Sequence, residues 1–127
     1  YQLTSNFLVK KGMQQYDSLR GIKDERLDKI LSVMMSRYNE PLTLKELSAE
    51  LYLSNAYLSK YIKEKSGMTF GDILKQIRMK KARAMLRSGN ATVESIAEMV
   101  GYQNVEHFNR VFKKMYHTTP VQYRNKK

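Results

Sequence analysis

The chain contains no cysteine, and this absence excludes several functional classes. Without a thiol there is no disulfide framework, no thiolate metal site and no cysteine nucleophile, so we expect a protein of the reducing cytoplasm. No apolar run approaches the roughly 18 residues that a membrane span needs, and no signal peptide opens the chain. We therefore expect no membrane partner.

Proline is also scarce, with two residues in the whole chain. Pro41 and Pro120 both fall where an element starts, and no stretch alternates apolar and polar residues with the period of two that marks a strand. From Asp24 onward, apolar residues instead recur at helical spacing. The sequence therefore predicts an all-α fold.

Acidic residues are few beside basic ones. The chain has 12 Asp+Glu against 23 Lys+Arg, a formal net charge of +11 and a pI near 9.9. Residues 1–23 show no sustained period, and the chain begins at Tyr1 rather than at methionine, so we interpret this segment as a linker or the tail of a missing upstream domain. The remaining residues, 24–127, still carry a net charge of +8, which favours an anionic partner.

Helix-start signals divide residues 24–127 into about seven helices, of which six can be placed. Thr43 and Glu46 form a capping box, Thr69 and Asp72 form a similar pair, and Gly67 can end a helix in the left-handed conformation. The last placed helix runs through Tyr116 to a Thr-Pro stop. The six predicted caps are Asp24, Thr43, Ser54, Thr69, Thr92 and Asn104.

Two of the resulting helix pairs are copies of each other. SNAYLSKYIKEKSGMTF at 54–70 aligns with NVEHFNRVFKKMYHTTP at 104–120 at an offset of 50 residues. The shorter helices before them align at an offset of 49, where the small residues Ser48 and Ala97 coincide. This spacing predicts a duplicated helix-turn-helix, in which a small residue lets the second helix cross closely over the first.

The longer helix of the second copy has two different faces. Phe108 and Phe112 lie on an apolar stripe, whereas Asn109 and Arg110 lie on a polar stripe roughly opposite it. In a DNA major groove, arginine can donate to guanine and asparagine can pair with adenine. We therefore interpret Asn109 and Arg110 as the best-suited single base readers.

The helix between the two copies spans about 18 residues, from Phe70 to Arg87, and would be roughly 27 Å long. This length approaches the ~34 Å between successive major grooves on one face of B-DNA, so one chain could engage two adjacent grooves. Its basic residues are spread around the helix, and we expect some to contact phosphate and the rest to face water. They are Lys75, Arg78, Lys80, Lys81, Arg83 and Arg87.

Residues Leu42 to Arg124, about two thirds of the chain, strongly resemble the DNA-binding domain of AraC/XylS-type transcriptional regulators. The matching stretches are LTLKELSAELYLSNAYLSKYIKEKSGMTF, IRMKKARAMLRSG and SIAEMVGYQNVEHFNRVFKKMYHTTPVQYR. The resemblance implies two helix-turn-helix subdomains, at about 24–67 and 91–124, joined by a long linker helix at about 69–88. It also implies that the two recognition helices read successive major grooves, and that an N-terminal domain of the whole protein senses a ligand or dimerises.

The resemblance places the base-contacting residues on the two recognition helices, at Asn55, Ala56, Ser59, Lys60, Val105, Glu106, Asn109 and Arg110. We expect phosphate contacts at Ser54, Lys63, Thr69, Asn104, Lys113, Lys114 and Thr119. The expected partner is double-stranded DNA, and RNA polymerase is a candidate second partner. We expect this fragment to be monomeric, and a missing N-terminal domain could make the full-length protein a dimer.

Three residues depart from the pattern of the family. His117 stands where the family usually has glycine, and a side chain fits a positive φ less well than glycine does. Ala56 offers no hydrogen bond, only contact with a thymine methyl group, so the first motif would read less than the second. Glu106 can accept from cytosine but repels phosphate, so it is either a base reader or a filter against wrong sites.

Other functional classes fit the residues less well. No nucleophile with a base beside it, no phosphate-binding glycine loop and no carboxylate cluster is present, so we expect neither an enzyme nor a cofactor. His107 and His117 lack a metal-ligand spacing, so we expect no metal site. Tyr57, Tyr61 and Tyr102 fit packing better than base stacking. A non-specific nucleoid or RNA-binding helical module remains the alternative.

Overall fold

The computed structural model describes residue 19 and residues 24–126, and within 24–126 it contains seven α-helices and no strand. This confirms the predicted all-α fold. The linker predicted at 1–23 lies outside the described residues except for Leu19, whose side chain is buried. The helices are α3 (Glu25–Ser36), α4 (Leu44–Glu50), α5 (Asn55–Ser66), α6 (Phe70–Ser88), α7 (Val93–Met99), α8 (Val105–Tyr116) and α9 (Pro120–Asn125).

Each of the seven helices begins after a residue whose side-chain oxygen accepts a hydrogen bond from the backbone N–H three positions on. All six predicted caps are confirmed: Asp24, Thr43, Ser54, Thr69, Thr92 and Asn104. At Thr43 the predicted capping box is complete, because Glu46 accepts in return from the backbone N–H of Thr43 at 3.0 Å. Each such cap contributes about 0.5–2 kcal/mol, so local chemistry sets where the helices start.

The seventh helix, α9, begins where only a stop was predicted. Thr119 caps α9 and forms a second capping box with Gln122, and Pro120 occupies the first turn, where its missing N–H does no harm. Arg124 on α9 donates from Nε to the carbonyl oxygen of Leu86, 3.1 Å away, near the end of α6. The Thr-Pro pair therefore ends one helix and starts the next.

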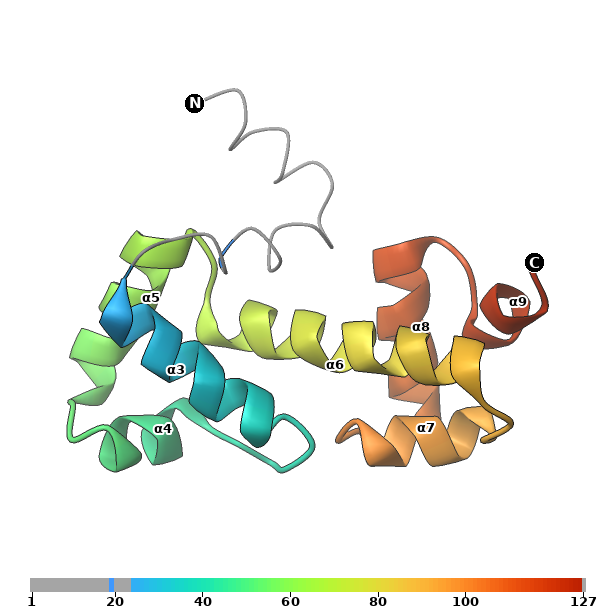
Figure 1. Ribbon diagram of the computed structural model, residues 1–127, viewed down its shortest axis with the longest axis horizontal. Coiled ribbons are helices and arrows are strands. Elements are labelled where there is room, and N and C mark those ends of the chain that lie inside the picture. Colours follow the sequence, from blue (N-terminus) through green and yellow to red (C-terminus); the bar gives the residue numbers. More distant parts are fainter. Residues whose placement is uncertain (1–18, 20–23, 127) are drawn as a thin grey trace, which may run out of the picture.

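Two hydrophobic cores lie along α6. The first core contains Ile73, Leu74 and Ile77 of α6 together with buried residues of α3, α4 and α5. The second contains Met79 and Leu86 of α6 with buried residues of α7 and α8. Each fully buried aliphatic or aromatic side chain contributes about 1.5–3 kcal/mol, so each core holds one helix-turn-helix on one half of α6. Figure 1 shows α6 running between the two groups of helices.

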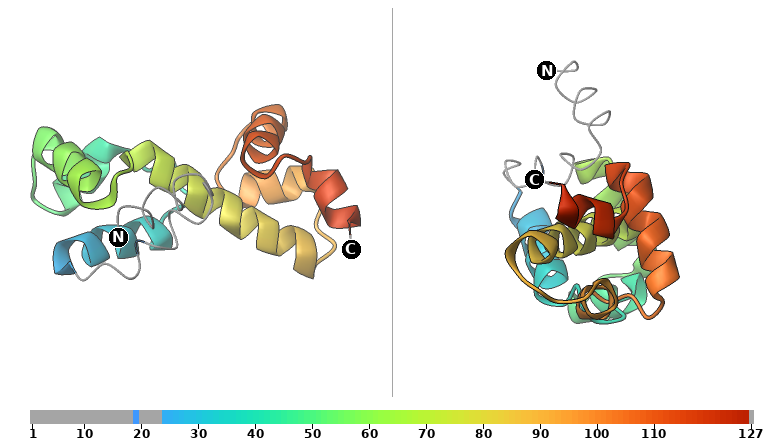
Figure 2. Two further views of the ribbon diagram at one scale, coloured as in Figure 1. Left: turned by 90° about the horizontal axis from the view of Figure 1, so that it is seen from above. Right: turned by 90° about the vertical axis from the view of Figure 1, so that its right-hand side faces the viewer.

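The two longer helices of the copies, α5 and α8, lie on the same side of α6. In Figure 2 they flank one side of α6 while α3 lies on the other. With 19 residues, α6 is about 28 Å long. The predicted linker helix is therefore confirmed in length.

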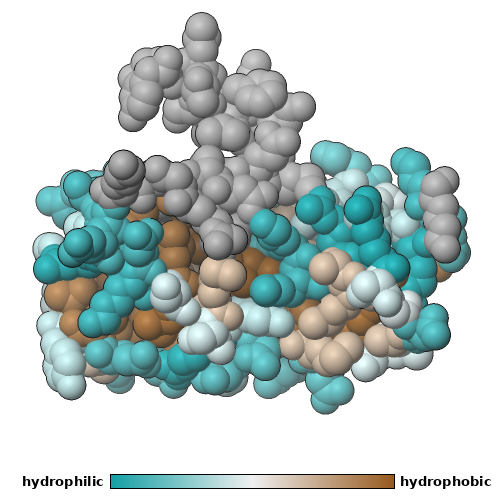
Figure 3. Space-filling model, viewed as in Figure 1, coloured by the Kyte–Doolittle hydropathy of each residue, from teal (hydrophilic) through white to brown (hydrophobic). Residues whose placement is uncertain are grey.

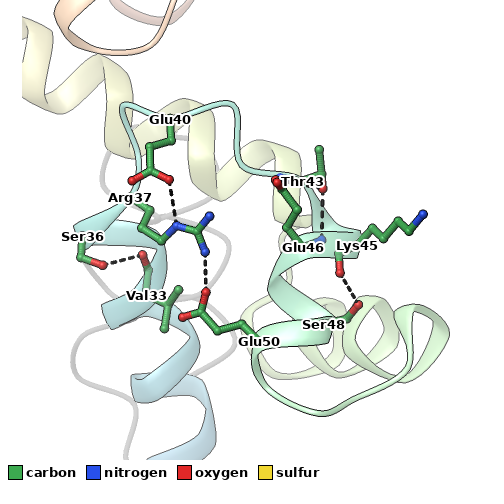
Figure 4. A network of polar contacts seen from close by, with 9 residues as sticks. All are labelled: Val33, Ser36, Arg37, Glu40, Thr43, Lys45, Glu46, Ser48 and Glu50. Carbon is green, nitrogen blue, oxygen red and sulfur yellow. Dashed lines mark hydrogen bonds and ion pairs between the residues drawn. The ribbon is translucent and has the colours of Figure 1, made fainter.

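The opposite face carries α3 and is mostly hydrophilic, with hydrophobic side chains showing around α3 and again on the right-hand half, over the region of α6 and α7 (Figure 3). Arg37, just after α3, forms ion pairs with two acidic residues. Its Nε lies 3.0 Å from Oε1 of Glu40, and its Nη1 contacts the carboxylate of Glu50 on α4 (Figure 4). Exposed ion pairs of this kind contribute about 1 kcal/mol or less, so Arg37 mainly orients the connection from α3 to α4.

Candidate nucleic-acid interface

The two helix-turn-helix units are built by the same hydrogen bonds. In the first turn, the N–H of Leu53 donates to the carbonyl of Ser48, and in the second the N–H of Tyr102 donates to the carbonyl of Ala97, both at 2.9 Å. Ser48 and Ala97 are both buried, as the alignment of small residues predicts. The duplication inferred from the sequence is therefore a duplication of structure.

Each unit also contains two left-handed backbone positions, and at each of them one copy has glycine while the other does not. After the recognition helix, Gly67 (φ +77°) in the first unit corresponds to His117 (φ +63°) in the second. Inside the turn, Tyr52 (φ +59°) corresponds to Gly101 (φ +98°). The strained backbone expected at His117 is present, whereas the equivalent feature at Tyr52 was missed, although the offset of 49 aligns it with Gly101.

The inward face of α8 consists of aromatic rings. Phe108 and Phe112 are fully buried, and the ring of Phe112 lies 4.7 Å from that of Tyr116 and 5.7 Å from that of Tyr123 on α9. Such edge-to-face pairs add about 0.5–1.5 kcal/mol each to the burial energy. The rings fix the rotation of α8 about its axis, which determines the side chains that its other face presents.

The outward face of α8 presents Glu106 and Arg110 to solvent, while Val105 and Asn109 are only partly exposed. The Oδ1 atom of Asn109 is buried and has no hydrogen-bond partner among the described residues. Bidentate pairing with adenine needs both Oδ1 and Nδ2 at the surface. Base contact by Asn109 therefore stays a prediction that requires its side chain to rotate, whereas Arg110 is available as it stands.

On α5, the four predicted base-contacting residues are all exposed. Asn55 accepts a hydrogen bond from the hydroxyl of Ser48 through Oδ1, which leaves its amide group as a donor. Lys60 lies 4.0 Å from the carboxylate of Glu64, with both side chains largely exposed. An exposed pair of this kind is weak, so Lys60 can exchange Glu64 for another acceptor. Ala56 and Ser59 lie beside them on the same surface.

The predicted phosphate contacts fall into caps and lysines. The four cap side chains, those of Ser54, Thr69, Asn104 and Thr119, accept from backbone N–H groups at 2.9–3.1 Å, and the hydroxyls and the amide can still donate outward. Helix N-termini also carry a partial positive charge that attracts anions. The lysines, which are Lys63, Lys113 and Lys114, are exposed in the second half of each recognition helix.

One of the basic residues of α6 differs from the expectation for this helix. We expected contact with phosphate or with water, and this is wrong for Arg78, which donates to the carbonyls of Tyr38 and Glu40 inside the protein. Three further basic side chains of α6 lie 5.0–5.8 Å from the centres of tyrosine rings, and these contacts leave them able to reach water or phosphate. They are Lys81, Arg83 and Arg87.

Tyr57 and Tyr61 on α5 are bound to the start of α3. The hydroxyl of Tyr61 donates to Oδ1 of Asp24 at 2.5 Å, which raises the pKa of Tyr61 to about 12 and holds the pKa of Asp24 below its usual value. Arg26 donates to the hydroxyl of Tyr57 at 2.5 Å, and its guanidinium lies 5.6 Å from the ring of Tyr61. These tyrosines therefore anchor α5 to α3, which agrees with a packing role.

Among residue 19 and residues 24–126, the structure contains no cluster of three or more His, Cys, Asp or Glu side chains able to hold a metal ion. Within the same residues, no helix is both long and apolar enough to cross a membrane.

Comparison with known proteins identifies the family. A family model described as a helix-turn-helix domain matches residues 47–126. The C-terminal domain of the two-component response regulator yesN from Fusobacterium nucleatum superposes with a TM-score of 0.77 at 38% identity, over 80% of this chain and 100% of that chain. The chain belongs to the AraC/XylS family of transcriptional regulators. The resemblance seen in the sequence is thereby confirmed.

Other members of this fold and family extend the comparison. The regulatory protein PocR of Salmonella typhimurium is 30% identical over 125 residues, which is 94% of this chain and 41% of PocR. The DNA-binding domain of AdpA, solved in complex with a target DNA, shares the fold with a TM-score of 0.73 at 18% identity, over 77% of this chain and 88% of that chain. This AraC-type chain spans less than half the length of the curated relatives it matches, between 13% and 41% of the first three.

Proposed function

We propose that this AraC-type domain binds specific sequences of double-stranded DNA, with α5 and α8 in successive major grooves. The observation that carries the proposal is the placement of two equivalent recognition helices on one side of α6 (Figure 2). A linker helix of about 28 Å approaches the ~34 Å between successive major grooves on one face of the duplex.

The side chains on these two helices differ in how selectively they can recognise bases. Arg110 is exposed on α8 and can donate two hydrogen bonds to guanine, which would discriminate against a wrong base by about 1–3 kcal/mol. Ser59, Lys60 and the amide of Asn55 offer less selective donors on α5. The second motif therefore contributes more of the sequence preference than the first.

Charge supports an anionic partner but does not select among nucleic acids. The formal net charge of +11 predicts a steep loss of affinity with salt for any polyanion. The AdpA domain, which shares this fold, was solved in complex with a target DNA, and this supports DNA as the partner. A non-specific nucleoid protein or an RNA-binding module would use the same charge without the paired geometry of α5 and α8.

The curated relatives are longer than this chain. Because the relatives are regulators much longer than this chain, we propose that it acts within a larger cytoplasmic transcription regulator. RNA polymerase is the natural second partner of such a regulator bound near a promoter. We expect the domain itself to bind as a monomer, with any dimer formed through another domain.

Selection of bound sites from a random duplex library, followed by footprinting of the winner, tests this function. We expect one enriched sequence, a protected region of about two helical turns and a specificity ratio of roughly 10³ or more over random duplex. A non-specific module would yield no enriched sequence, and an RNA-binding module would prefer single-stranded or A-form RNA in competition. Either result refutes the proposed function.

Two substitutions on α8 separate base reading from phosphate contact. Arg110→Ala should lose about 1–3 kcal/mol on the selected site and relax the preference at one base pair. Lys113→Ala should weaken binding to all sequences alike and lower the salt slope by about one. Lys29→Ala, on α3 at the far side of α6, removes the same charge as a control and should change neither. If the two α8 variants behave identically, Arg110 does not read a base.

A further inference from the structure

The linker helix passes from one core to the other at a single arginine. Ile77 is buried in the first core and Met79 in the second, and Arg78 lies between them with its side chain half-buried. Long basic side chains usually keep their charged group in water. The half-buried guanidinium of Arg78 is instead bound by groups of the protein itself.

Arg78 contacts both halves of the molecule. Its Nε donates to the carbonyl oxygen of Tyr38 at 2.7 Å and its Nη2 donates to that of Glu40 at 2.8 Å, both in the connection that follows α3. The same guanidinium lies 5.6 Å from the ring centre of Tyr102, which stands in the turn before α8. One guanidinium group thus donates to two carbonyls of the first unit and lies over a tyrosine ring of the second.

The second unit approaches this junction closely because it has a glycine there. A Cβ atom on Gly101 would lie 3.1 Å from Nε of Arg78 and 3.1 Å from the carbonyl oxygen of Tyr38. The ring of Tyr38 packs against both cores. Figure 1 shows the connection after α3 and the end of α7 meeting beside the middle of α6. We call the meeting point of the two units the junction; it consists of Tyr38, Arg78, Gly101 and Tyr102.

The contacts at this junction are directional. Guanidinium is a rigid fork that remains charged, and two carbonyl acceptors fix both its position and its tilt. Both side chains are partly withdrawn from solvent here. This burial lowers the pKa of Arg78 and raises the pKa of Tyr102. The strongest helix packing elsewhere lies within a unit or onto α6, as in α4 on α5 and α7 on α8. The angle between the two units therefore depends on α6 and on this junction.

We propose that Arg78 is a positioning residue that holds the two recognition helices at one relative orientation, and so sets the spacing of the two half-sites that the domain accepts. The inference rests on the proposed function, because a fixed orientation matters only if both helices read the same duplex. An arginine whose guanidinium is bound by carbonyls of the protein would thereby control the geometry of the target.

The physical consequence is a dependence on spacing. Inserting or deleting one base pair between the half-sites moves one of them by about 3.4 Å and rotates it by about 35° around the duplex. A domain with a fixed junction cannot follow this change and loses the contacts of one helix. A domain with a loosened junction can follow it, but it binds the correct site less tightly, because ordering the two units upon binding then costs entropy.

Arg78→Met and Arg78→Lys test the proposal on DNA. Met keeps much of the apolar stem without the donors, and Lys keeps the charge without the fork. The measured quantity is the ratio of the affinity for the selected site to the affinity for the same site with one base pair inserted or deleted between the half-sites. For the unchanged protein we expect this ratio to be about tenfold or more. In both variants this ratio should fall to about threefold or less, with unchanged base preference within each half-site. If both variants keep the full ratio, the proposal is overturned.

Gly101→Ala perturbs the same junction without touching Arg78, and it has a matched control. Its new Cβ must displace the guanidinium or the carbonyl of Tyr38, so it should also relax the dependence on spacing. Gly67→Ala likewise introduces a side chain at positive φ, but its Cβ meets nothing within 4 Å. Gly67→Ala should therefore lower stability while the spacing ratio stays intact. Equal spacing ratios for the two alanine variants would contradict the proposal.

A measurement without DNA separates this inference from the proposed function. Because the chain has no cysteine, Ala49→Cys on α4 and Ser95→Cys on α7 would provide two unique sites for spin labels at exposed positions. We expect a narrow distance distribution in the unchanged protein and a broader one with Arg78→Met or Gly101→Ala, at unchanged helix content. An unchanged distribution in both overturns the positioning role. If site selection fails but the distribution broadens, the junction is confirmed as an orienting device and the fault lies with the proposed function.

Discussion

Exchanging the residues at the two equivalent left-handed positions, Gly67 and His117, should move the stability of the fold in opposite directions. Backbone strain at positive φ destabilises the fold by roughly 1 kcal/mol for a residue that has a side chain. Histidine adopts this conformation more readily than β-branched residues do. Replacing His117 by glycine relieves this strain, but about half of the gain in stability is offset because glycine loses more conformational entropy on folding. His117→Gly should therefore stabilise by about 0.5 kcal/mol, or roughly 2–4 °C in melting temperature for a domain of about 100 residues.

The assay is urea unfolding followed by far-UV circular dichroism, with the slope of the transition as an internal check. Gly67→His is the reverse change at a site where a Cβ meets nothing within 4 Å, so it should destabilise by a similar amount. The double exchange should return close to the starting stability, because distant sites add. If His117→Gly is less stable than the unchanged protein, the His117 imidazole makes contacts that outweigh its backbone strain, and the reasoning fails.

Two further predictions concern the cores and the acid limit of stability. Phe112→Ala should lose about 3–5 kcal/mol in urea unfolding, because Phe112 is fully buried among aromatic rings, whereas Met99→Ala at an exposed position should stay within about 0.5 kcal/mol. Asp24 has a lowered pKa because it accepts from Tyr61 and from the N–H of Leu27, so its contribution is present above its ordinary pKa of 3.8 and is lost as the pH falls below it. Asp24→Asn should flatten this part of the stability profile measured against pH, and an unchanged profile would exclude Asp24 as a source of the acid sensitivity.

Helix starts were predictable because their causes are local. A cap such as Ser54 or Asn104 binds a backbone group three residues away, so a short window of sequence contains both partners. The duplication was predictable because the same packing problem is solved twice with the same spacing. The seventh helix, α9, which was not placed from the sequence, carried the same kind of signal, since Thr119 and Gln122 form a capping box.

The contacts of Arg78 could not be predicted in this way. Its acceptors, the carbonyls of Tyr38 and Glu40, lie 40 and 38 residues away along the chain, and backbone carbonyls carry no sequence signature. The partial burial of Asn109 was missed for a related reason. Helical periodicity gives the direction of a side chain but not the neighbours that cover it, so an outward stripe on a helical wheel can still include a buried oxygen.

The turn positions of the two copies, Tyr52 and Gly101, show how a duplicated motif acquires unequal freedom to vary. Both positions have a positive φ, yet Tyr52 is 95% exposed while a Cβ on Gly101 would press on Arg78 and on the chain at Tyr38. After a duplication, the first copy could therefore exchange glycine for a large side chain by accepting backbone strain alone. In the second copy the same exchange would also displace Arg78 or the backbone at Tyr38. The residues allowed at the two equivalent turn positions therefore depend less on the turn itself than on which part of the protein packs against each turn.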